Sequence, residues 1–189
     1  MSSTNRGGDR HASDYYVTPV QPIIDFLRAA QEDLGPAFNP KEILDTCAGG
    51  DPKHDMSYPT AFKAVFPQAV IATIDIREDS LAEFKGDYLE MKDIGQVEFI
   101  CSNPPFSLAM DFIKKALWDS SGWVAMLLRV NYFGADKRYK WWQEHMPVYS
   151  YVHHKRMSFV DSKKTDSIEY MHCLWRPGTY PKHTQLRII

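Results

Sequence analysis

The segment Ser102-Asn103-Pro104-Pro105-Phe106 holds the residue types with the most specific chemistry in this chain. Two successive prolines fix the backbone and remove two N–H donors, so the preceding carbonyls have few local partners and can face an external donor. Asn103 adds a side-chain carbonyl, and Phe106 adds a flat apolar face suited to stacking on a base. An exocyclic amino group between the amide oxygen of Asn103 and the carbonyl of Pro104 would have both hydrogens held.

An amino nitrogen held in this way presents its lone pair to an electrophile. The catalysis then rests on alignment and on stabilisation of developing charge, and it requires no catalytic histidine or carboxylate. The alternative is structural: Asn103 caps the next helix, and the prolines occupy the first turn.

Three more segments carry polar or glycine residues where a predicted strand ends. In Asp45-Thr46-Cys47-Ala48-Gly49-Gly50 the glycines let the backbone approach a ligand, although an ordinary turn has the same composition. Asp75 could accept hydrogen bonds from both hydroxyls of a ribose, or it could cap a helix. Asp87, in 86–89, could accept from an adenine amino group, or it could simply stabilise a turn.

Alternating strands and helices must position these segments. Hydrophobic spacing predicts a helix of about 14 residues from Thr18-Pro19 onward, with proline at its first turn. Further helices are expected at 57–66 and 107–119, and strands at 42–45, 69–75, 97–101, 123–130, 148–153 and 168–176, with a small strand or turn at 86–89. The alternation predicts an α/β protein with a parallel sheet covered by helices on both faces. In such sheets ligands bind beyond the carboxyl ends of the strands.

In this order, the four strand-end features resemble those of class I S-adenosylmethionine-dependent methyltransferases, and within that class the enzymes that modify adenine N6 in DNA. Small bacteriophage or prophage DNA adenine methyltransferases are the most similar group, and the resemblance spans about residues 14 to 189. It implies a Rossmann-like fold whose mostly parallel sheet has an antiparallel last strand. It also implies S-adenosyl-L-methionine as the cofactor.

The resemblance assigns roles to individual residues. The signature Asn/Asp-Pro-Pro-Tyr/Phe implies that the target base is held and stacked by Asn103, Pro104, Pro105 and Phe106. It implies a cofactor site made by Thr18, Pro19, Asp45, Cys47, Ala48, Gly49, Asp75, Ile76, Asp87, Tyr88 and Asn103. One departure concerns the glycine loop, which is usually Gly-x-Gly. Here Gly49 and Gly50 are adjacent, and Asp51 stands at the second glycine position.

The two parts of the chain differ in charge. Residues 1–128 contain 11 Lys and Arg against 19 Asp and Glu, whereas residues 129–189 contain 11 against 5 and five of the seven histidines. A basic C-terminal part could contact phosphates or could simply be a solvated face. The candidate nucleic-acid-binding residues are Lys137, Arg138, Lys140, Lys155, Arg156, Lys163 and Lys164.

The aromatic residues of segment 131–146 also allow two interpretations. With the neighbouring cations they could form a stacking platform for an extruded base, or they could belong to an amphipathic helix that packs Trp141 on the sheet. No metal site is expected: three distant cysteines have no C-x-x-C spacing, and alternating burial on a strand accounts for His172 and Cys173 better than metal ligation with His153 or His154.

The expected function is therefore methyl transfer from S-adenosylmethionine to the amino group of a flipped-out adenine in DNA. Alternatives are RNA methylation at adenine N6 or guanine N2, methylation of a protein glutamine, and a non-catalytic cofactor-binding subunit of a modification complex. Residues 1–14 are expected to form a flexible arm, and 15–189 a single catalytic domain without a separate target-recognition domain. No apolar segment suits a membrane helix, so a cytoplasmic protein is expected, in the host cytoplasm if phage-encoded. A monomer and a homodimer both remain open.

Overall fold

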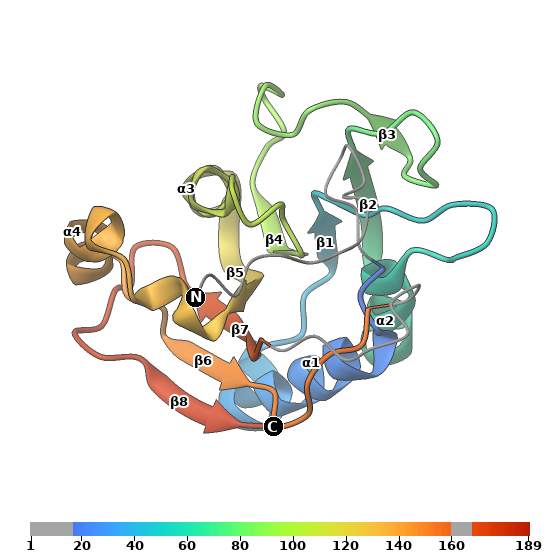
Figure 1. Ribbon diagram of the computed structural model, residues 1–189. Helices are drawn as coiled ribbons and strands as arrows, with labels where there is room; N and C mark the ends of the chain where they lie inside the picture. Colours follow the sequence, from blue (N-terminus) through green and yellow to red (C-terminus); the bar gives the residue numbers. More distant parts are fainter. Residues whose placement is uncertain (1–16, 160–167) are drawn as a thin grey trace, which may run out of the picture.

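The computed structural model describes residues 17–159 and 168–189 (Figure 1). The expected flexible arm at 1–14 and the candidate phosphate contacts Lys163 and Lys164 lie outside these residues. The helices and strands are, in chain order, α1 (Val20–Leu34), η1 (Gly35–Ala37), β1 (Glu42–Asp45), α2 (Ser57–Val65), β2 (Val70–Asp75), β3 (Phe84–Lys85), β4 (Val97–Ser102), α3 (Ala109–Asp119), β5 (Ser120–Arg129), η2 (Val130–Phe133), α4 (Asp136–Glu144), β6 (Tyr149–Val152), β7 (Tyr170–Trp175) and β8 (Gln185–Ile188).

The strands form one sheet in the order β3-β2-β1-β4-β5-β7-β6-β8. Strands β3, β2, β1, β4 and β5 are mutually parallel, β7 is antiparallel to both β5 and β6, and β8 is parallel to β6. After β1 the chain builds β2 and β3 on one side, and it later adds β4 and β5 on the other. The carboxyl ends of β1 and β4 therefore flank a topological switch point, where α/β sheets bind ligands.

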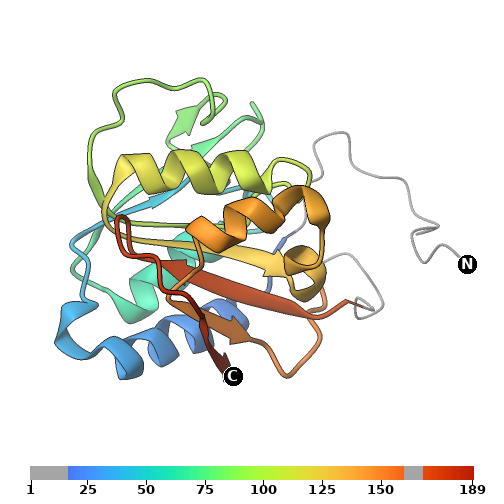
Figure 2. The same cartoon turned by 90° about the vertical axis from the view of Figure 1, so that its left-hand side faces the viewer.

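Helices cover both faces of the sheet, as Figure 2 shows with α3 and α4 on one side and α1 and α2 on the other. Buried side chains Ile23 and Phe26 of α1 and Phe62 of α2 share a core with Phe99 and Trp123 of the sheet. On the opposite face, α3 and α4 pack on side chains that alternate with these along the same strands, including Ile100 and Val124. Burying each large apolar side chain contributes about 1.5–3 kcal/mol, so both helix layers are held firmly against the strands.

The fold class expected from the sequence is confirmed: a mostly parallel sheet, an antiparallel strand at 170–175 and helices on both faces. Strand β1 and helices α1, α2 and α3 lie where hydrophobic spacing placed them. Strand β8 was not predicted, and the small strand expected near 86–89 is instead β3, just before it. Of the helices in the described part of the chain, none is both long and apolar enough to span a bilayer.

Candidate functional site

A cleft opens at the switch point, between the carboxyl ends of β1, β2 and β4. It encloses about 940 Å³, its open mouth included. It is lined by Val17, Thr18, Thr46, Cys47, Ala48, Gly49, Gly50, Ser57, Tyr58, Asp75, Ile76, Arg77, Asp87, Asn103, Pro104, Pro105, Phe106, Leu108 and Phe112. Three of the four strand-end segments therefore meet in one cavity, and Asp87 of the fourth joins them.

The glycine loop and the end of β2 are tied together by Asp75. Its Oδ2 accepts a hydrogen bond from the amide of Gly49 at 2.7 Å, and its Oδ1 accepts from the amide of Arg77 at 2.8 Å. The guanidinium of Arg77 donates to the carbonyl of Gly50 at 2.8 Å. Gly49 and Gly50 have φ angles of 65° and 73°, a left-handed conformation that favours glycine, and a Cβ on Gly50 would lie 2.8 Å from Met56 Cγ. The adjacent glycines thus make a tight turn despite the missing Gly-x-Gly spacing.

Asp45 lies behind the glycine loop, fully buried. Its Oδ1 accepts from the hydroxyl of Ser102 at 2.6 Å and from the amide of Cys47 at 3.1 Å, whereas its Oδ2 accepts no hydrogen bond from any described residue. Burial raises the pKa of this carboxyl to about 7, against the opposing effect of the two hydrogen bonds. Asp45 therefore retains a free buried acceptor beside the cleft.

Cys47 lines the cleft, but its chemistry is limited. Burial raises the pKa of its thiol well above the usual value, and the neighbouring carboxylates of Asp45 and Asp75 act in the same direction. Because the thiolate is the nucleophilic form, Cys47 is suited to contact a ligand and not to attack one.

Asn103 and the prolines form the other wall of the cleft. The Asn103 amide nitrogen donates to the Thr18 hydroxyl at 3.0 Å, and its Oδ1 is buried with no hydrogen-bond partner among the described residues. The carbonyl of Pro105 accepts from the amide of Leu108, whereas no amide of the described segments donates to the carbonyl of Pro104. Two acceptor oxygens, Asn103 Oδ1 and the Pro104 carbonyl, are thus left for an external donor. The segment does not cap α3, which begins at Ala109.

Phe106 is half-buried at the rim of the cleft. The guanidinium carbon of Arg129 lies 4.4 Å from the centre of the Phe106 ring, and the Tyr170 ring lies 5.8 Å away. The ring is therefore held in place by neighbouring groups while it also borders the cavity.

The remaining predicted cofactor residues have different positions. Ile76 lines the cleft with 61% of its surface exposed, which leaves an apolar face for a flat ligand. Asp87 also lines it, and its Oδ1 accepts from the amide of Leu89. Tyr88 does not line the cleft: it is buried, its hydroxyl donates to Asp119 at 2.9 Å, and its ring packs on Phe112. Pro19 borders a second hollow, beside the start of α1.

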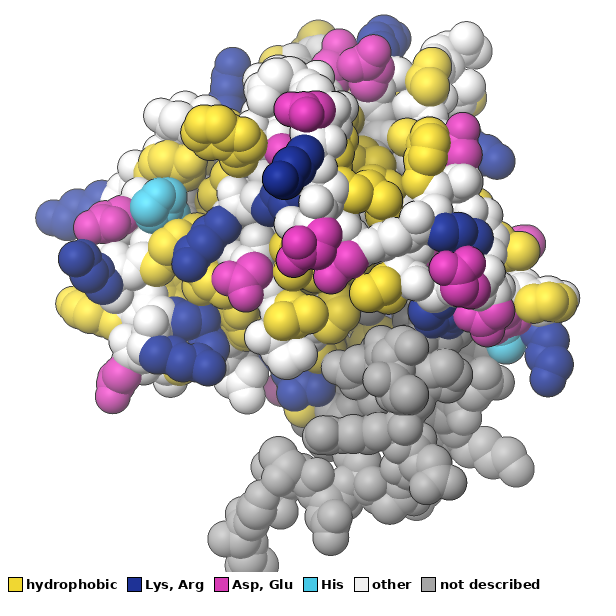
Figure 3. Space-filling view, turned by 90° about the horizontal axis from the view of Figure 1, so that it is seen from above, with side chains coloured by type: hydrophobic (Ala, Val, Ile, Leu, Met, Phe, Trp, Pro, Cys, Tyr) yellow, Lys and Arg dark blue, Asp and Glu magenta, His cyan; other side chains and the backbone are white. Residues whose placement is uncertain are grey.

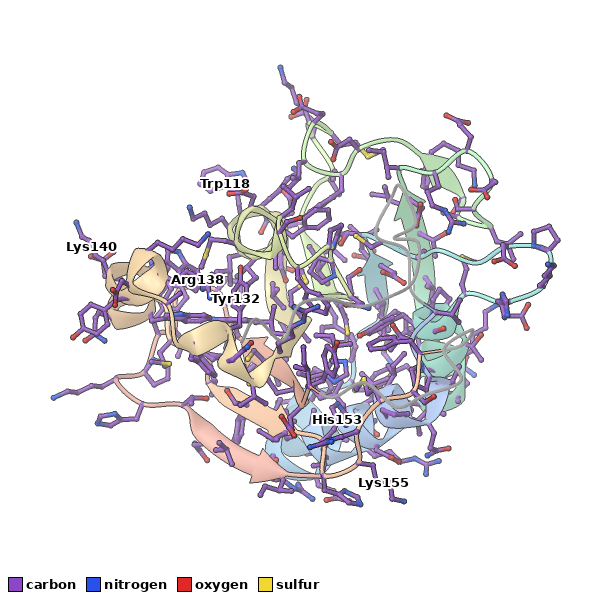
Figure 4. The ribbon with its side chains drawn as sticks, viewed as in Figure 1. Trp118, Tyr132, Arg138, Lys140, His153 and Lys155 are labelled. Atoms are coloured by element: carbon purple, nitrogen blue, oxygen red, sulfur yellow. The ribbon has the colours of Figure 1, made fainter. Side chains whose placement is uncertain are left out.

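The five predicted phosphate contacts within the described residues form two groups, and Figure 4 labels Arg138 and Lys140 of one group and Lys155 of the other. Arg138 and Lys140 lie on α4, with Lys137 in the same helix, whereas Lys155 and Arg156 follow β6 near α1. Arg138 donates to the carbonyl of Tyr132, and its guanidinium lies over that ring at 3.9 Å. Arg156 forms an ion pair with Glu169 at 3.1 Å. Lys137, Lys140 and Lys155 are exposed.

Packing accounts for most aromatic residues of segment 131–146. Trp142 is buried and stacks on Trp175, and Trp141 packs against both. Tyr132 is also buried, so an amphipathic helix describes this segment better than a stacking platform does. Tyr139 is the exception, with 65% of its surface exposed. In Figure 3, Lys and Arg side chains gather on the left of the view, where α4 lies, beside a band of hydrophobic side chains.

A chain of buried hydrogen bonds runs beneath the cleft. The hydroxyl of Tyr58 lies 2.9 Å from His172 Nε2, and His172 Nδ1 lies 2.8 Å from His153 Nε2. Phe26 stacks on the His172 ring at 4.2 Å. Burial lowers the pKa of His153 to about 4 and also lowers that of His172, so both rings are neutral at physiological pH. The pair connects β6 and β7 to α2, and the described residues contain no cluster suited to a metal ion.

Replacing His153 by Gln is expected to make the fold less sensitive to acid. Since the unfolded chain binds a proton near pH 6.5 and the folded ring only near pH 4, wild-type stability falls as pH drops through this window. A shift of this size corresponds to about 3 kcal/mol. Asp45, with its raised pKa, acts in the opposite direction, so the comparison must be made between variant and wild type. Urea unfolding at a series of pH values should show a smaller loss of unfolding free energy on acidification in the variant than in the wild type. Equal losses in the two proteins would contradict a lowered pKa of His153.

Several lining residues were missed by the sequence analysis. Arg77 was detectable as the cation two positions after Asp75, and its Nε lies 3.9 Å from Asp75 Oδ1. Tyr58 and Ser57 reach the cleft from α2, and no local pattern marks them. Arg129, which contacts Phe106 but does not line the cleft, was also missed: it is a lone charged residue at the carboxyl end of an apolar strand, as Asp45 and Asp75 are.

Comparison with known proteins extends these observations. No protein-family model and no curated protein matches the sequence. Among solved structures, the chain is similar to a Listeria monocytogenes protein assigned as a class I S-adenosylmethionine-dependent methyltransferase, with a TM-score of 0.65, 11% identity and coverage of 97% of this chain and 68% of that one.

Two further solved structures are also described as methyltransferases. A Pyrococcus horikoshii protein assigned as an RNA methyltransferase has a TM-score of 0.64 and 16% identity, over 90% of both chains. The methyltransferase subunit of a type I restriction-modification system from Streptococcus thermophilus has a TM-score of 0.69 and 12% identity, over 92% of this chain and 47% of that subunit. The chain thus spans about half of that subunit. Identities this low show a shared fold, and the fold of this chain is that of the class I methyltransferases.

Proposed function

We propose that this chain is an S-adenosylmethionine-dependent methyltransferase that acts on the N6 amino group of adenine in DNA. The observation that carries the proposal is the pair of acceptors at Asn103 Oδ1 and the Pro104 carbonyl. Neither accepts a hydrogen bond from a described residue, and both border a cleft that the glycine loop closes from the other side. An NH₂ group supplies the two donors that such a pair lacks.

The residues on the opposite wall fit the proposed cofactor. Each carboxylate oxygen of Asp75 accepts one backbone amide and has a further lone pair available to a ribose hydroxyl. The exposed face of Ile76 suits an adenine ring. Asp45 does not line the cleft, but its free Oδ2 places a buried acceptor behind the glycine loop, on the side proposed for the methionine part of the cofactor. When bound, S-adenosylmethionine supplies an electrophilic methyl group on a sulfonium.

The residues of the chain then act by position. Asn103 and Pro104 hold both hydrogens of the amino group, so that the nitrogen lone pair is turned toward the methyl donor, and the developing positive charge is stabilised by the two oxygens. Thr18 orients the Asn103 amide, because its hydroxyl accepts from the amide nitrogen and leaves the amide oxygen without a partner among the described residues. Phe106 stacks on the base, which must leave the duplex to reach the cleft. The proton lost from the nitrogen passes to solvent.

The direct test is incubation of the full chain with unmodified DNA and tritiated S-adenosylmethionine, followed by digestion and identification of the labelled nucleoside. N6-methyladenine is the expected product. RNA supplied in a parallel reaction tests the second nucleic-acid substrate, and a glutamine-containing peptide tests the protein alternative. Cofactor binding without label in any of these acceptors would instead indicate a non-catalytic subunit.

Replacing Phe106 by Ala is expected to lower kcat/KM for DNA by about 10- to 100-fold, since stacking of a base on an aromatic ring contributes about 1–3 kcal/mol. Phe106→Tyr retains the ring and should stay close to wild type. Titration with S-adenosylhomocysteine measures whether cofactor binding is unchanged in both variants. Equal activity of the Ala variant would remove Phe106 from the base-binding site.

A further inference from the structure

A cation lies on the ring that borders the cleft. Arg129 is the last residue of β5, and in the sheet it pairs with Tyr170 of β7. Its guanidinium carbon is 4.4 Å from the centre of the Phe106 ring. Arg129 therefore lies beside the residue to which we assign stacking on the target base, although it does not itself line the cleft.

The charge of Arg129 has no anionic partner among the described residues. Its Nε is buried and donates no hydrogen bond to a described residue. By contrast, Arg156 pairs with Glu169, and Arg187 pairs with Glu32 and Asp33. A partly buried guanidinium loses hydration, and the loss is best offset by an anion that can take up the planar N–H groups. The environment of Arg129 is thus suited to an external anion.

Phosphate matches this position for a geometric reason. Guanidinium groups bind phosphate through two parallel N–H donors, a geometry that a lysine ammonium lacks. In a nucleotide a single sugar separates the base from its phosphate, so a cation on the base-stacking ring is within reach of the backbone of the same nucleotide. A free base or a protein glutamine would leave Arg129 without a partner.

We infer that Arg129 binds a phosphate of the polynucleotide that carries the target base, and so is a positioning residue that makes phosphodiester-linked nucleotides the substrate class. The inference rests on the proposed function. The chain after Arg129 supports the inference, because η2 and α4 follow directly. The Arg138 guanidinium lies over the Tyr132 ring, and Lys140 on the same helix is exposed (Figure 4). The chain that follows Arg129 thus carries two further cations, Arg138 and Lys140, on α4.

The test measures kcat/KM for methylation of a random-sequence DNA duplex as a function of salt concentration. Each phosphate contact contributes about 0.9 to the slope of log affinity against log salt for duplex DNA, and about 0.7 for a single strand. Arg129→Gln should therefore lower kcat/KM about tenfold or more at low salt. The slope of log kcat/KM against log salt should also become shallower by the contribution of about one phosphate contact. Arg187→Gln is the matched control: its cation is paired with Glu32 and Asp33, it is not among the candidate phosphate contacts, and the slope should change little.

Arg129→Lys provides a second variant that preserves the charge and the aliphatic stem. It should keep the wild-type slope and lose part of kcat/KM, because an ammonium cannot form the bidentate contact. Binding of S-adenosylhomocysteine and the unfolding temperature verify that each variant is folded. A folded Arg129→Gln that methylates DNA with the wild-type slope would overturn the role of Arg129 and leave the proposed function intact. A wild-type protein that neither binds nor methylates DNA or RNA would overturn both.

Discussion

Asn103→Ala should reduce methyl transfer by about 100- to 1,000-fold and leave cofactor binding nearly unchanged. The expected size is that of removing one preorganised group that stabilises developing charge, about 10²–10³-fold in kcat. Asn103 Oδ1 is the buried acceptor of this site, and the substitution deletes it while retaining the prolines and Phe106. Single-turnover transfer to DNA and titration with S-adenosylhomocysteine separate the two effects.

Two further variants sharpen this prediction. Asn103→Asp keeps an acceptor oxygen at the same position and should retain more activity than the Ala variant. Thr18→Val removes the hydroxyl that orients the amide while keeping its volume, so an intermediate loss of kcat is expected. If Asn103→Ala loses cofactor binding and transfer together, then Asn103 acts on the cofactor side of the cleft and its proposed contact with the amino group is wrong.

Asp75→Ala should weaken cofactor binding by about a hundredfold or more. Hydrogen bonds to a charged acceptor contribute about 1.5–3 kcal/mol each, and the proposed ribose contact uses this carboxylate. The substitution also removes acceptors from the amides of Gly49 and Arg77, so the glycine loop loses its connection to β2. Isothermal titration with S-adenosylhomocysteine measures the loss of affinity, and urea unfolding measures the accompanying loss of stability.

The matched control is Glu78→Ala, which removes an exposed carboxylate three residues further along the chain. It should bind the cofactor like wild type, which separates a local contact from a general change of charge. Asp75→Asn keeps the shape and one acceptor oxygen, and it should fall between the two. An Asp75→Ala variant that is folded and binds with wild-type affinity would place the ribose elsewhere in the cleft.

The base-holding segment could be predicted from its residues because its geometry is local. Proline fixes its own φ and restricts the residue before it, so Asn103-Pro104-Pro105 is held extended regardless of the rest of the chain. Gly49 and Gly50 similarly indicate a left-handed turn without reference to distant residues. The positions of Asp45 and Asp75 followed from apolar runs that end in an acid.

Side-chain direction could not be obtained in the same way. Tyr88 follows Asp87 directly, yet its side chain lies in the core. Its hydroxyl donates to Asp119 and its ring packs on Phe112, both on α3. In the sequence, Trp141 and Trp142 are equally suited to contact a base or to pack in the core. The structure shows that both pack against Trp175. These partners are separated by 24 to 34 residues, so no short pattern contains them.

The amino-acid sequence on its own determined the kinds of chemical group at the strand ends and the order of those ends, since both depend on residues that are neighbours along the chain. The tertiary structure decided which groups meet. Thr18 contacts Asn103 across 85 residues, Tyr58 contacts His172 across 114, and Arg129 lies on Phe106 only because β5 runs beside β4 and β7. Such pairs arise from strand order and helix packing, which depend on burying apolar surface over the whole sheet.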